Sequence, residues 1–132
     1  MKTRTGFVSN SSASSFVVPR LIKDIDSVKQ TIKEMLINAY IDEYGYNIDK
    51  AKSMAGDVVK NDIFIIPVVA QTAAERRELA EYVNNITYYG VQPQEFKFGT
   101  TWIVGHDNVI PYTAMDNIIE QFGCIYYNRH MG

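Results

Sequence analysis

The chain has 132 residues, 46% of them hydrophobic and 21% charged, and its formal net charge is −2. These values suit one globular domain, and the charge is too small to indicate nucleic-acid or membrane binding by itself. No apolar run approaches the ~20 residues of a membrane helix, so no membrane partner is expected. The single cysteine, Cys124, excludes an intrachain disulfide.

Positive charge is concentrated at the start of the chain. Residues 1–23 hold four basic and no acidic residues (net +4), and residues 24–132 hold the other 9 basic and all 15 acidic residues (net −6). A basic arm beside an acidic body either packs on that body or binds a partner, phosphate included. We treat residues 1–15 as a serine-rich basic arm and residues 16–132 as a single α/β domain.

In chain order, the body first predicts a strand at residues 16–19, a helix that Asp24 or Asp26 caps and that stops near Gly45, a second helix at 48–55 and a second strand at 63–70. Apolar residues at three- and four-residue steps indicate the first helix, which Gly45 ends. Asn47 caps the second helix, and Gly56 ends it. The second strand is continuously hydrophobic, which suits a central strand buried on both faces. Pro67 cannot donate to a ladder, so it marks a bulge or the end of that strand.

The second half predicts a helix, a long strand, another helix and a final strand, over residues 73–85, 95–104, 114–122 and 124–128. Thr72 caps the first of these helices with Glu75 in the capping-box position, and Gly123 ends the last helix. The long strand is expected to bulge at Gly99, and residues 105–108 are expected to form a turn.

The predicted order of elements is therefore β-α-α-β-α-β-α-β. Because helices and strands alternate, the helices should pack on a four-stranded sheet. The predicted fold class is α+β with α/β alternation, in a single domain. The sequence contains no internal repeat, and its one low-complexity segment is the serine run near the start.

The sequence carries no strong catalytic, metal or cofactor motif. His106 and Asp107 could do acid–base work in the predicted turn, although adjacent turn residues seldom converge. With two histidines and one cysteine the chain lacks metal-ligand spacing, and it has no phosphate-binding glycine motif. Cys124 opens an apolar strand and is expected to be a small buried hydrophobe. We expect no cofactor and no metal, and we favour a non-enzymatic protein.

Two stretches are candidate binding surfaces. The serine run from Ser9 to Ser15 can cradle a phosphate, accept phosphorylation, or act as a flexible linker. Tyr88 and Tyr89 lie on a predicted loop, where they either contact a protein partner or half-cover the sheet edge. Few basic residues surround them, which disfavours base stacking. The candidate binding residues are Arg4, Phe7, Ser9, Asn10, Ser11, Ser12, Phe16, Arg20, Tyr88 and Tyr89.

Residues 6–16 run Gly-Phe-Val-Ser-Asn-Ser-Ser-Ala-Ser-Ser-Phe and follow the basic residues Lys2 and Arg4. This stretch resembles an N-terminal signature of small uncharacterised proteins, many of them from tailed bacteriophages. Those proteins typically begin with one or two basic residues, then Gly-Phe-Val-Ser-Asn and a serine run that ends in Phe. The chain departs from the pattern at Ala13, where serine is usual. The resemblance implies a bacteriophage context and transfers no activity.

The sequence thus favours a non-enzymatic, bacteriophage-type binding protein that acts through protein contacts. The resemblance implies a virion or assembly component, or a modulator of a host complex, in the host cytoplasm or the virion. One alternative is an accessory protein that binds nucleic acid through the basic arm. Another is a small phosphate-handling enzyme that uses His106 and Asp107. A homo-oligomer also stays open.

Overall fold

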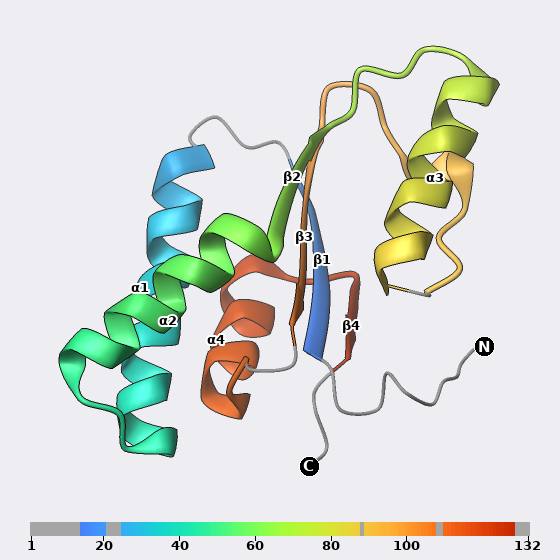
Figure 1. The fold of residues 1–132 in the computed structure, drawn as a ribbon. Helices are drawn as coiled ribbons and strands as arrows, with labels where there is room; N and C mark the ends of the chain where they lie inside the picture. Colours follow the sequence, from blue (N-terminus) through green and yellow to red (C-terminus); the bar gives the residue numbers. More distant parts are fainter. Residues whose placement is uncertain (1–13, 21–24, 88, 108–109, 129–132) are drawn as a thin grey trace.

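The structure is a computed structural model that describes residues 14–20, 25–87, 89–107 and 110–128. Within these ranges, four strands form one antiparallel sheet with helices on both faces (Figure 1). In chain order the elements are β1 (Ser14–Arg20), α1 (Ile25–Tyr44), α2 (Ile48–Asn61), β2 (Ile63–Pro67), α3 (Ala73–Thr87), the 3-10 helix η3 (Pro93–Glu95), β3 (Thr101–Asp107), α4 (Tyr112–Phe122) and β4 (Tyr126–Asn128). The predicted fold class and order of elements are confirmed.

The strands lie in the order β2-β3-β1-β4. β1 pairs with β3 along its whole length, whereas β4 pairs only with residues 15–17 of β1. β2 is therefore an edge strand, and the prediction of a central strand at 63–70 was wrong. Its continuous hydrophobicity has another cause. Ile63 and Ile65 belong to the core on one face of the sheet, and Phe64 and Ile66 belong to the core on the other.

Both prolines in the sheet lie where a missing N–H costs no ladder bond. The Asp62 carbonyl accepts a bond from the His106 N–H at 3.0 Å, and the Val68 N–H donates to the Thr100 carbonyl at 2.8 Å, so both residues face β3. Because strand residues alternate, Pro67 faces the open edge, where β2 ends. On β1, the carbonyl of Val17 accepts a bond from the chain just before β4, at 3.1 Å. The backbone of Pro19 faces the β4 side as well, but β4 pairs only with residues 15–17, so no ladder bond is lost there.

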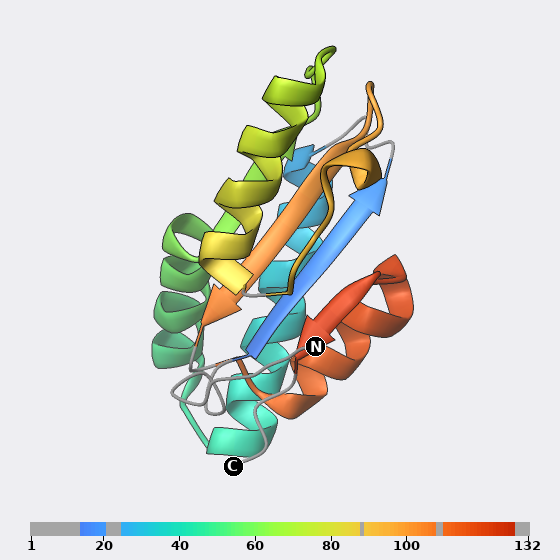
Figure 2. The same ribbon diagram turned by 90° about the vertical axis from the view of Figure 1, so that its right-hand side faces the viewer.

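The two faces of the sheet carry unequal layers (Figures 1 and 2). On one face α1, α2 and α4 cover a core that includes Phe16, Val18 and Ile103. On the other face α3 and η3 cover Val17, Trp102 and Val104 of the sheet. α3 buries Ala80 and Val83, and the Phe96 ring stacks on Trp102 with centroids 4.0 Å apart.

Phe16 belongs to the core rather than to a binding surface. Its side chain is fully buried, although the sequence suggested it as a contact residue. Phe16 lies opposite Gly105 in the β1–β3 register. A Cβ at Gly105 would collide with the Phe16 ring, so only glycine leaves room for it. Ser15, the residue before Phe16, also belongs to β1. This strand begins at Ser14, within the segment expected to be the arm.

The predicted end of the second helix was wrong for a reason that local sequence does not show. α2 does not end at Gly56, because its buried face continues through Ala55 and Val58 to the end of the helix at Asn61. By contrast, Gly123 ends α4 in the left-handed conformation as predicted, with φ 65°.

The predicted strand at 95–104 is confirmed over residues 101–104 and was wrong over residues 95–100, and the predicted turn at 105–108 was wrong over residues 105–107. Residues 93–95 form η3, and Gly99, with φ 87°, lies in a turn that leads into β3. Residues 105–107 continue β3, because they pair with residues 14–16 of β1. The local turn residues there are overridden by strand pairing across the sheet.

Candidate functional site

The predicted binding residues separate into those that the structure describes and those that it does not. Arg20 is the last residue of β1. Phe16 is buried in the core, and Tyr89 is half-buried after α3. The others lie outside the described residues: Arg4, Phe7, Ser9, Asn10, Ser11, Ser12 and Tyr88.

Ser15 and Tyr89 belong to the two stretches expected to bind partners, and the structure brings them together. We call Ser15, Tyr89, Glu95 and Tyr126 the tyrosine cluster. The Ser15 and Tyr89 hydroxyls are hydrogen-bonded. The Tyr89 ring stacks on Tyr126 with centroids 5.3 Å apart. The Tyr126 hydroxyl donates to the Glu95 carboxylate, 2.8 Å from each oxygen. These contacts fasten the connection between α3 and β3 to β1 and β4.

The environment of the tyrosine cluster keeps both phenols protonated. Burial raises the pKa of Tyr89. Burial, followed by the hydrogen bond and charge of Glu95, raises the pKa of Tyr126 to about 12. Neutral phenols that bond inside the protein stabilise the fold. Tyr89 therefore covers the sheet, which was one of the two interpretations, and is not a freely presented contact residue.

The acid–base and thiol candidates gain no support. His106 lies in β3 rather than in a turn, and its backbone N–H donates to the Asp62 carbonyl at 3.0 Å. Burial raises the pKa of the half-buried Cys124 thiol to about 11, which disfavours the nucleophilic thiolate. Among the described residues, no group of three or more His, Cys, Asp or Glu side chains could hold a metal ion. None of the helices in the described ranges could cross a membrane.

A different surface stands out at the other end of the sheet. Val69 is 72% exposed and Phe98 is 64% exposed, the largest fractions among large hydrophobic side chains of the described part. We call the exposed residues Pro67, Val69 and Phe98 the apolar tip. Figure 1 shows their loops side by side, at the end of the molecule away from the start of β1 and the end of β4.

Hydrogen bonds hold the two loops of the apolar tip together. The Val68 N–H donates to the Thr100 carbonyl at 2.8 Å, and the Gly99 N–H donates to the Val68 carbonyl at 3.0 Å. The Thr100 hydroxyl donates to the Lys97 carbonyl at 2.6 Å, which closes the turn around Phe98. Phe98 and Val69 are thus exposed on fixed backbone rather than on open loops.

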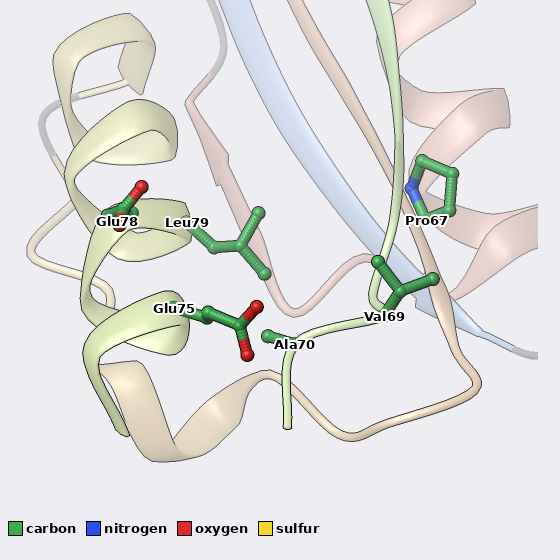
Figure 3. A pocket seen from close by; sticks show the side chains of 6 residues that line it. All are labelled: Pro67, Val69, Ala70, Glu75, Glu78 and Leu79. Atoms are coloured by element: carbon green, nitrogen blue, oxygen red, sulfur yellow. The ribbon is translucent and has the colours of Figure 1, made fainter. Parts of the chain in front are cut away.

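A hollow of about 200 Å³ lies beside Val69, and we call it the tip pocket (Figure 3). The chain around the end of β2 supplies one wall and α3 supplies the other. The lining residues are Pro67, Val69, Ala70, Glu75, Glu78 and Leu79. The pocket is mostly apolar, with two carboxylates on the α3 side.

Glu75 is fixed by its role at the start of α3. Its Oε1 accepts the backbone N–H groups of Gln71 at 3.0 Å and Thr72 at 3.1 Å. In return the Glu75 N–H donates to the Thr72 hydroxyl at 3.1 Å, which confirms the predicted capping box. These hydrogen bonds to the backbone lower the pKa of Glu75, so its carboxylate is ionised at neutral pH.

Comparison with known proteins assigns no relative: no family model, curated protein or solved structure matches the chain. The apolar tip was missed at the level of sequence because Val69 and Phe98 were both placed in predicted strands. Two local signals could have revealed it. Val69 follows Pro67, which ends β2, and Phe98 precedes Gly99, which turns the chain.

Proposed function

We propose that the chain is a non-enzymatic binding protein that acts through protein contacts at its apolar tip. The observation that carries this proposal is the exposure of Val69 and Phe98 on two loops held together by backbone hydrogen bonds. Large hydrophobic side chains exposed on a fixed backbone are typical of sites that a partner covers.

The energetics favour such an interface. Burial of one valine or phenylalanine side chain contributes about 1.5–3 kcal/mol. Because the turn at Gly99 and the link from Val68 to Thr100 already fix the backbone, little ordering opposes association. The resemblance of the N-terminal stretch to bacteriophage proteins supports a partner from a phage or its host, and a virion, assembly or host-modulating role.

Affinity capture with a tip variant tests the proposal. The tagged protein, with Val69→Ser and Phe98→Ser together, is compared with wild type in nuclease-treated lysate from the producing cells. Loss of two apolar anchors should reduce the captured protein partner by more than about tenfold.

The matched control is the double variant Ile48→Ser and Tyr82→Ser. Its two side chains, which are 49% and 47% exposed, lie outside the tip. This control should capture as wild type does. Equal capture by the tip variant would contradict the proposal. A partner that is captured only when the nuclease is left out would also contradict it and would favour the nucleic-acid alternative.

A further inference from the structure

We propose that the tip pocket receives one arginine or lysine side chain of the partner, presented within an apolar segment. The inference rests on the proposed function and names the chemistry that the same surface recognises. It follows from the size of the pocket, its lining and the open edge of β2.

The size of the pocket suits one side chain. Sites for cofactors and drug-sized molecules have volumes of about 300–1,000 Å³, and the tip pocket, which is open to solvent, has a volume of about 200 Å³. A small molecule of that class would not be enclosed. A single long side chain, anchored by the rest of its own protein, needs less room.

The lining suits an amphipathic cation. Pro67, Val69 and Leu79 offer apolar surface to a methylene stem, as long basic side chains require. Glu75 and Glu78 place carboxylates on the α3 side, and none of the lining residues is basic. Figure 3 shows the Glu75 carboxylate between Ala70 and Leu79, beside the apolar wall.

Glu75 can accept a bond from a bound cation without giving up its own role. The three hydrogen bonds that Glu75 accepts from Gln71 and Thr72 all reach Oε1. None of these bonds reaches the second oxygen, Oε2, which can accept one from a guanidinium or ammonium group beside the existing charge interaction of Glu75 with Arg76. Charge complementarity therefore favours a basic side chain over an acidic or purely apolar one.

The edge of β2 favours entry of a side chain rather than addition of a strand. Pro67 faces that edge and has no N–H to donate. A proline at such a position blocks the continuous ladder that a strand from another chain would need. The partner then contacts this end of the sheet through side chains.

Binding of two peptides tests the inference. The probes are acetylated and amidated Ala-Leu-Arg-Leu-Ala and the same peptide with citrulline, the neutral isostere, in place of arginine. Each is titrated into the full-length, isotope-labelled protein and followed by amide NMR shifts. The arginine peptide should shift amides in residues 68–70 and 75–79, and should bind about two- to fivefold more tightly than the citrulline peptide.

Charge variants locate the effect. Glu78→Gln should weaken the arginine peptide about two- to fivefold and leave the citrulline peptide unchanged. Glu120→Gln makes the same charge change on an exposed residue of α4 and should change neither. Equal binding of the two peptides, no effect of Glu78→Gln, or shifts confined to other elements would overturn the inference.

A further variant separates the partner from the basic arm of the chain itself. If Lys2→Gln with Arg4→Gln raised the affinity for the arginine peptide by more than about tenfold, the arm would be the occupant and the inference would be wrong. Loss of capture in the Val69/Phe98 variant, together with no preference for arginine, would leave the proposed function intact and reject only this inference.

Discussion

The tyrosine cluster and the apolar tip flank the same helix, α3, and use their large side chains in opposite ways. After α3, the Tyr89 and Tyr126 rings stack and both hydroxyls are bonded within the protein. Before α3, Val69 extends into solvent beside the turn that presents Phe98. Tyrosine is the residue more often found in interfaces, yet here its hydroxyl finds an internal partner and the aliphatic and phenyl groups are presented instead.

We therefore expect the tyrosine cluster to stabilise the fold and the apolar tip to bind the partner. Substitutions in the tyrosine cluster should change the free energy of unfolding and leave binding alone. Substitutions at the apolar tip should do the reverse, since exposed side chains contribute little to the folded state.

Tyr89→Phe should give the largest loss of stability. It removes the hydrogen bond to Ser15, whose side chain is 3% exposed and would keep a buried hydroxyl without that partner. The expected loss is about 1–3 kcal/mol in the free energy of unfolding, measured by urea titration. Tyr82→Phe, on a 47% exposed side chain, is the control and should change it by less than about 0.5 kcal/mol. Equal effects of the two variants would mean that the cluster is not structural.

Alkaline pH should weaken the fold through the same tyrosines. An unfolded tyrosine ionises near its ordinary pKa of 10, whereas burial raises the pKa of Tyr89 and raises that of Tyr126 to about 12. Above pH 10 the unfolded chain therefore binds fewer protons than the folded chain, and stability falls as pH rises. The urea midpoint of the wild-type protein should decline from about pH 9 to pH 11. The midpoint of the Tyr126→Phe variant should decline less steeply. Parallel declines would contradict the assignment.

Val69→Ser with Phe98→Ser should have the smallest effect on stability. The two side chains are 72% and 64% exposed, so the free energy of unfolding should change by less than about 0.5 kcal/mol. The urea midpoint measured beside the capture experiment checks this. A loss above about 1 kcal/mol would place the tip in the core and remove the distinction between the two regions.

Much of the fold could be predicted because its signals are local. The capping box of Thr72 and Glu75 and the left-handed Gly123 need only a few neighbouring residues, and both are present as predicted. The strand boundaries depend on pairing between residues 14–20 and 101–107, which lie far apart in the chain. Gly105 therefore looks like a turn residue in isolation and is a strand residue in the fold.

The candidate site was predictable only in part, for the same reason. Tyr89 looks exposed until Ser15, 74 residues earlier, supplies its partner. Phe98 looks like an alternating strand residue until Gly99 turns the chain and Val68 fixes the turn. In both places a contact between distant segments decides which side chains reach solvent.

Photo-crosslinking shows whether the apolar tip contacts a protein partner. A photoreactive phenylalanine derivative replaces Phe98 in one variant and Tyr82 in another, and both are irradiated in the cells that naturally produce the protein. We expect a protein adduct from position 98 and none from position 82. An adduct from position 82 alone, or an adduct of position 98 with nucleic acid rather than protein, would contradict the proposal.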